Sequence, residues 1–184
     1  MLRLVTAPAA EPVSLEDAKD WIYVSHNDDD ALIASLIRSA RQEVESMTRR
    51  KLLKQTLAQV LPAFPCGEII LETAPVDVSS VVVTYLDADG AEQTLAGARA
   101  YSRNGLVRVL PADGEAWPDT LPGADAVTVT FDAGYADAAT LEAEAEPLIR
   151  AVKNIVAQDY DRRQISGGRG IDHLVGPFTV ARFI

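Results

Sequence analysis

The stretch that decides the fold is NDDDALIASLIRSARQEVESMTRR, residues 27–50. Its apolar side chains recur at the spacing of one helical face: Leu32, Ile33, Leu36, Ile37, Ala40, Val44 and Met47. Asn27 or Asp28 is a suitable N-cap, and the basic residues at the far end complement the negative end of a helix dipole. The spacing predicts a long amphipathic helix over about 28–50.

A shorter helix precedes this one, and a third follows much later. Ser14, with Asp17 three residues on, resembles a capping box, and apolar residues follow it at helical spacing. This predicts a helix over about 14–23. Near the other end, Pro147 suits a first helical turn, and an apolar stripe continues to Tyr160. The third predicted helix covers about 147–164.

Between the second and third helices the apolar period changes from helical to alternating. Residues 54–135 carry turn residues every eight to twelve positions, and their prolines oppose a helix. Asp89-Gly90 and Asn104-Gly105 are typical of short hairpins, because both central positions of a type I′ turn need positive φ. The strands are predicted at 55–61, 68–72, 79–86, 91–95, 99–103, 106–110 and 125–132.

These elements predict an α+β protein. The expected architecture is a small helical bundle, built from two N-terminal helices and one C-terminal helix, with an antiparallel β unit inserted at about 54–135. We expect residues 1–165 to form a single domain. Residues 166–184 are expected to be a glycine-rich hinge, SGGRG, followed by an extended apolar C-terminal tail.

Charge and composition exclude several classes of protein. The 184 residues carry 17 Lys/Arg and 27 Asp/Glu, a net charge of -10, which disfavours a protein that grips a phosphate backbone. The predicted β insertion is the most acidic part, with four Lys/Arg and eleven Asp/Glu, a net of -7. No apolar run approaches the roughly 20 residues of a membrane helix, so no membrane partner is expected.

The sequence contains no recognisable catalytic motif. It has no GxSxG, HExxH, CxxC or Walker lysine, and its one cysteine lacks partners for a metal site. We therefore expect no enzyme activity, no cofactor and no metal. An acidic hydrolase remains an alternative, because carboxylates such as Asp87, Asp89 and Asp132 could converge in space and one would then have a raised pKa.

Two segments have the composition of interaction surfaces. The densest basic cluster is a predicted contact with an acidic neighbouring subunit, and consists of Arg49, Arg50, Lys51 and Lys54. The apolar tail is a predicted docking segment, through Phe178, Val180, Phe183 and Ile184, since these side chains would otherwise lie exposed. The alternatives are solvated helix-end charge and a tail that folds back on the β unit of its own chain.

The ordered set of motifs resembles a known family. SLEDAK at 14–19 and NDDDALIASLIRSARQEVE at 27–45 precede a β-rich insertion that contains Trp117-Pro118. VTVTFDAGY at 127–135 and PLIRAVKNIVAQDYDRR at 147–163 then close the pattern. Together they resemble the head–tail connector (adaptor) proteins of long-tailed double-stranded DNA phages and of gene transfer agents, over roughly residues 13–163.

The resemblance implies a structural role and a set of partners. Such connectors form a homo-oligomeric ring, of about twelve copies, under the portal protein of a DNA-filled head. They extend the DNA channel toward a neck, stopper or tail-completion protein, and double-stranded DNA passes through without sequence-specific binding. The implied location is the neck of a virion or virion-like particle, assembled in the bacterial cytoplasm. A peptide- or protein-binding module is the main alternative function.

Overall fold

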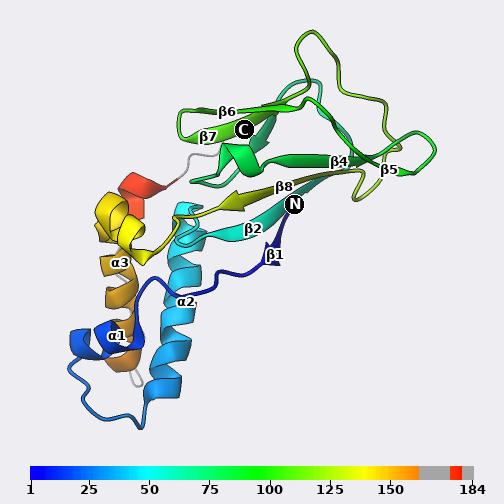
Figure 1. The fold of residues 1–184 in the computed structure, drawn as a ribbon. Helices are drawn as coiled ribbons and strands as arrows, with labels where there is room; N and C mark the ends of the chain where they lie inside the picture. Colours follow the sequence, from blue (N-terminus) through cyan, green and yellow to red (C-terminus); the bar gives the residue numbers. More distant parts are fainter. Residues whose placement is uncertain (162–174, 180–184) are drawn as a thin grey trace. The chain divides into compact units, whose positions relative to one another are not determined.

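The chain contains a β unit and a helical unit, each with its own core. The computed structural model describes residues 1–161 and 175–179. The β unit comprises Met1–Pro8 and Gln55–Gly134, and the helical unit comprises Ala9–Lys54 and the described residues from Tyr135 onward. The predicted α+β class is confirmed, because the described residues combine helices with antiparallel sheets (Figure 1). The predicted hinge at 166–170 lies outside the described residues.

The helical unit is built from α1 (Leu15–Trp21), α2 (Asp30–Thr48) and α3 (Ala138–Asp161). Helix α2 runs alongside α3 (Figure 1), and the predicted apolar stripe of α2 supplies part of the core between them. The fully buried side chains of that core include Ile33, Val44, Leu52, Leu141, Leu148 and Ile155. The structure therefore places the stripe where its periodicity predicted, except for Leu32, which is exposed.

The N-termini of α1 and α2 differ in their capping. Ser14 caps α1 as predicted, since its hydroxyl accepts a hydrogen bond from the Asp17 amide at 3.0 Å. The predicted cap of α2 is wrong: Asp29 occupies that position without a side-chain cap bond. The Asn27 side chain instead accepts a hydrogen bond from Lys19 Nζ at 2.7 Å, and Asn27 lies two positions before the N-cap.

Helix α3 begins nine residues earlier than predicted. Asp137 starts it by accepting the Thr140 amide at 2.7 Å. This bond holds the pKa of the Asp137 carboxyl below its ordinary value. Pro147 has no backbone N–H and so cannot donate a helical hydrogen bond. The helix kinks just before it, at Ala145 (φ -150°, ψ 43°). The predicted start at Pro147 is therefore the start of the second straight segment only.

Two antiparallel sheets make up the β unit. The five-stranded sheet has the order β1-β2-β8-β4-β5, from Leu2–Thr6, Gln55–Leu61, Val127–Ala133, Val82–Leu86 and Glu92–Thr94. The three-stranded sheet has the order β3-β7-β6, from Ile69–Leu71, Leu106–Leu110 and Arg99–Arg103. A short 3₁₀ turn, Val78–Ser80, replaces the predicted start of β4. Both sheets contribute to one apolar core: Leu57, Ile69, Leu71, Val83, Val107, Val109, Val127, Val129, Phe131 and Ala133.

The two predicted hairpins have different turns. Asn104 and Gly105 both have positive φ, at 54° and 76°, so β6 and β7 are joined by the predicted two-residue turn. In the other hairpin only Gly90 has positive φ, and the Asp87 carboxylate accepts the Asp89 and Ala91 amides. That connection is a three-residue loop, and the prediction of a type I′ turn there is wrong.

Residues 55–134 are flanked by Lys54 and Tyr135, which are distant in the sequence but hydrogen-bonded to each other in the helical unit. The Lys54 amide donates to the Tyr135 carbonyl at 2.8 Å, and Leu53 forms a parallel bridge with the same residue. Residues 55–134 therefore form a closed insertion whose two ends are joined by backbone hydrogen bonding.

Candidate functional site: the basic cluster and the C-terminal anchor

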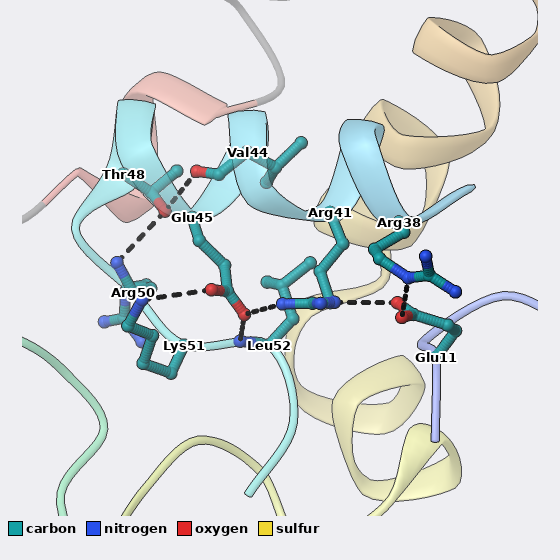
Figure 2. Close-up of polar contacts among 9 residues, drawn as sticks. All are labelled: Glu11, Arg38, Arg41, Val44, Glu45, Thr48, Arg50, Lys51 and Leu52. Carbon is teal, nitrogen blue, oxygen red and sulfur yellow. Dashed lines mark hydrogen bonds and ion pairs between the residues drawn. The ribbon is translucent and has the colours of Figure 1, made fainter. Parts of the chain in front are cut away.

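The basic cluster begins directly after α2. Thr48 Oγ1 donates to the Val44 carbonyl at 2.7 Å and accepts the Arg50 amide at 3.2 Å, which ends the helix (Figure 2). Arg49 then adopts a left-handed conformation, with φ 56°, and turns the chain away. The predicted basic last turn of α2 is wrong, since Arg49, Arg50 and Lys51 follow the helix.

The buried carboxylate of Glu45 binds the residues that follow α2. The Glu45 side chain, only 4% exposed, accepts hydrogen bonds from Lys51 Nζ at 3.0 Å and from the Leu52 amide at 3.2 Å. Arg41 NH1 lies 3.4 Å from the same carboxylate (Figure 2). A carboxylate removed from water in this way is stable only because donors replace its hydration.

Arg41 connects this carboxylate to the segment before α1. Its Nε donates to Glu11 at 2.7 Å, while Arg38 lies 3.9 Å from the other oxygen of Glu11 (Figure 2). Burial alone would lower the pKa of the Arg41 guanidinium, but its hydrogen bond to Glu11 and the charge of Glu45 raise it. Arg41 therefore pairs with both carboxylates, and these contacts fix Glu11 and Leu52 against α2.

Arg50 joins the basic cluster to the C-terminal region. Its Nε donates to the Phe178 carbonyl at 2.8 Å, and its NH1 donates to the Tyr135 hydroxyl at 3.2 Å. The guanidinium carbon also lies 5.8 Å from the centre of the Phe178 ring, within range of a cation–π contact. A residue predicted for subunit contact and one predicted for portal docking therefore bind each other.

We call the described segment Val175–Thr179 the C-terminal anchor. Val175 is buried in the helical core, and Phe178 packs against that core half-buried. Gly176–Phe178 form a 3₁₀ turn, so the extended conformation predicted for this part of the tail is wrong. Apolar packing and the Arg50 contacts outweigh an extended conformation here. The other predicted docking residues, Val180, Phe183 and Ile184, lie outside the described residues.

The basic residues of the cluster differ in their surroundings. Lys51 is paired with Glu45, Arg50 holds Phe178, Arg49 is half-buried and Lys54 is exposed. Sequence reasoning found the cluster and the tail but missed Glu11, Arg41, Glu45 and Tyr135. The i, i+4 spacing of Arg41 and Glu45 on the apolar side of α2 was the one available signal.

The described part of the chain gives little support to hydrolase chemistry. Three of the described carboxyl groups, those of Glu68, Asp87 and Asp137, have a pKa below the ordinary value. For Asp87 the main cause is a hydrogen bond from Gln93, and Asp132 accepts the Thr56 hydroxyl at 2.7 Å. Hydrogen-bonded carboxylates of lowered pKa are poor proton donors near neutral pH.

Neither a metal site nor a catalytic carboxylate pair stands out in the residues described. No group of three or more His, Cys, Asp or Glu that could hold a metal ion occurs among them. A hollow of about 360 Å³ in the β unit is lined by Pro65, Cys66, Gly67, Leu110, Pro111, Glu115, Ala116 and Trp117. It contains one carboxylate beside apolar side chains, an arrangement that suits packing better than acid–base catalysis. Within the same residues, no helix is long and apolar enough to cross a membrane.

Residues 12–94 match the model of the family described as "Phage gp6-like head-tail connector protein". The resemblance that the sequence indicated is thereby confirmed. The comparison with curated proteins returns no match.

Solved structures of gene transfer agent (GTA) particles contain similar chains. A chain from the neck of an empty GTA particle, computed with C6 symmetry, is 25% identical and has a TM-score of 0.82. A chain from the virion of a native gene transfer agent is 26% identical, with a TM-score of 0.80. Each match covers 100% of this chain and 97% of the other. A chain from a native GTA neck, computed with C12 symmetry, shows the same fold at 24% identity, a TM-score of 0.77 and the same coverage. These similarities support a structural connector role.

Proposed function

We propose that this protein is a head–tail connector that forms a ring in the neck of a phage-like or gene transfer agent particle. The observation that carries the proposal is the full-length similarity to chains of GTA necks, together with the family match over residues 12–94. Cyclic symmetry in those necks supports a ring, and the proposed ring has about twelve copies. It would join the portal protein above to a neck, stopper or tail-completion protein below, without catalysis.

The charge of the β unit suits a channel that DNA crosses. Its four Lys/Arg and eleven Asp/Glu give it a net charge of -7, whereas the helical unit is closer to neutral. Acidic walls repel phosphate and keep a passing duplex mobile, since tight DNA binding needs clustered Lys or Arg. The proposed ring therefore conducts double-stranded DNA without sequence-specific contacts.

The C-terminal anchor attaches Phe178 to the helical unit. Arg50 and the apolar core both hold this residue. We propose that Phe178, Val180, Phe183 and Ile184 form the portal-docking segment, with Phe178 at its anchored end. The basic cluster, above all the exposed Lys54, would contact an acidic neighbouring copy.

The test is co-purification with portal protein from particle-producing cells. The full chain is compared with a chain ending at Thr179, which keeps the anchor and the helical core intact. A full-length triple variant, Val180→Ser, Phe183→Ser and Ile184→Ser, separates loss of apolar side chains from loss of length. Portal and neck proteins should co-purify with the full chain, and portal should be lost from both altered chains.

Two results would count against these proposals. If the full chain retains no particle component, the connector role is wrong. If the shortened chain and the triple variant retain as much portal as the full chain, the connector role stands and the docking tail is wrong.

A further inference from the structure

Strand β1 forms an open edge of the five-stranded sheet. It pairs with β2 on one side, and on its other side no strand of residues 1–161 or 175–179 is hydrogen-bonded to it (Figure 1). All five of its residues, Leu2–Thr6, are exposed. Folded proteins usually protect such an edge with charge, proline or a covering segment, because unpaired backbone groups recruit other strands.

The hydrogen-bond register shows which backbone groups face outward from β1. Met1 and Val60 exchange two backbone hydrogen bonds, each of 2.8 Å, so they form a hydrogen-bonded pair. Bonded and non-bonded pairs alternate along an antiparallel ladder, and Leu2 and Leu4 oppose Gln59 and Leu57 in the non-bonded positions. The amides and carbonyls of Leu2 and Leu4 therefore point away from β2, toward a missing strand.

The side chains of the same residues are also exposed to solvent. Leu2 is 41% exposed and Leu4 is 57% exposed. Leu4 lies opposite Leu57, which belongs to the core of the β unit, and directly opposed side chains share one face of a sheet. Leu2 and Leu4 therefore extend the apolar inner face of the sheet to an edge where nothing in the described residues covers them.

The other edge of this sheet has complementary properties. Strand β5 is also exposed, and the Leu95 amide donates to Val83 at 2.8 Å, which places Glu92 and Thr94 in outward-facing positions. Between Leu2 and Thr6 the one charged residue is Arg3, whereas between Glu92 and Thr94 it is Glu92. Arg3 is already paired with Asp125 of its own chain at 2.9 Å, so the two edges are complementary through their outward backbone groups and not through charge.

We propose that β1 of one copy of this chain pairs with β5 of a second copy and so joins their sheets. The proposal rests on the ring inferred above, because a closed ring of more than two copies needs two different surfaces on each protomer. The edges of a single sheet provide such a pair. Addition of a strand to a sheet edge satisfies the outward amides of Leu2 and Leu4 and covers their side chains.

Proline substitutions can block each edge separately. Leu4→Pro removes an outward amide without removing a β1–β2 hydrogen bond, and edge positions of this kind tolerate proline. Thr94→Pro does the same at β5. Ser102→Pro is the matched control, because Ser102 lies in a non-bonded position of β6, an edge of the other sheet.

The measurement is NMR titration of the isolated full chain, which also detects weak association. Leu4→Pro protein keeps an intact β5, and Thr94→Pro protein keeps an intact β1. Isotope-labelled Leu4→Pro protein, titrated with unlabelled Thr94→Pro protein, should therefore show chemical-shift changes at Glu92–Thr94. The reverse labelling should show shifts at Leu2–Thr6. Each of these variants titrated with itself should show neither set, whereas Ser102→Pro protein titrated with itself should show both.

Absence of shifts at both edges in the mixture would overturn the proposal. Equal chemical-shift changes when Leu4→Pro protein is titrated with itself would also overturn it. If Leu4→Pro does not fold, Thr94→Pro titrated with wild-type chain keeps the test, with shifts expected at β1 of the variant. The titration uses this chain alone, so its failure is distinct from failure of portal co-purification.

Discussion

Replacing Glu45 by glutamine removes one charge from the buried ion cluster at the end of α2 and changes the shape of the side chain very little. The variant loses the charge that faces Lys51 Nζ at 3.0 Å and Arg41 NH1 at 3.4 Å. Breaking a buried ion pair by removing one partner costs about 3–5 kcal/mol. Arg41 keeps Glu11, and the glutamine oxygen can still accept the Leu52 amide, so the expected loss is about 2–3 kcal/mol of unfolding free energy.

The assay is urea unfolding followed by the helical circular dichroism signal, which reports mainly on the helical unit. Glu146→Gln is the matched control, because Glu146 makes an exposed i, i+4 pair with Arg150 at 3.0 Å. Exposed pairs contribute about 0–1 kcal/mol, so this control should remain close to wild type. If Glu45→Gln differs from wild type by no more than Glu146→Gln does, the buried cluster does not stabilise the fold in the way inferred here.

Three further predictions follow from single contacts. Arg50→Ala should release the anchor around Phe178, and limited proteolysis should then cut it several-fold faster than in wild type. Gly105→Ala places a side chain at φ 76° and should lower the free energy of unfolding in urea by about 1–2 kcal/mol. Gly67→Ala is the control and should cost less, because the φ of Gly67 is not positive and no atom lies within 4 Å of the added methyl group. The Asp137 carboxyl should titrate below its ordinary pKa of 3.8 in NMR, so its cap stabilises α3 above that pH and is lost as the pH falls through the lower folded value.

Each of these has a contradicting result. Unchanged cleavage of the Arg50→Ala protein would mean that apolar packing alone holds the anchor. Equal stability of the Gly105 and Gly67 variants would mean that the β6–β7 turn tolerates a side chain. An Asp137 pKa at or above 3.8 would mean that the bond to the Thr140 amide is absent in solution.

Elements with a buried face were predictable from sequence. The stripe of α2 and the strands Gln55–Leu61 and Leu106–Leu110 each repeat an apolar pattern long enough to reveal their period. Asn104-Gly105 revealed its turn because few residue pairs tolerate positive φ twice. In these cases the local pattern and the tertiary fold agree.

The features missed from sequence depend on contacts between distant segments. Strand β1 has no buried face, so its short sequence gave no core signal, and only its pairing with β2 defines it. The bond between Arg50 and Phe178 joins residues 128 positions apart. The Glu11–Arg41 bond likewise spans 30 positions, and no local rule links such residues. The basic cluster and the tail were therefore found as separate segments, and their contact was not.

The hydrogen bond between Lys54 and Tyr135 closes the larger segment of the β unit, residues 55–134, whereas β1 joins the same unit from the start of the chain. Because the two ends of residues 55–134 are held together by the helical unit itself, a replacement of quite different length can span the same gap at little entropic cost. Insertions whose ends lie close together are the ones that proteins accept most readily. Changes of length in the loops within residues 55–134 should therefore leave the core of the helical unit intact.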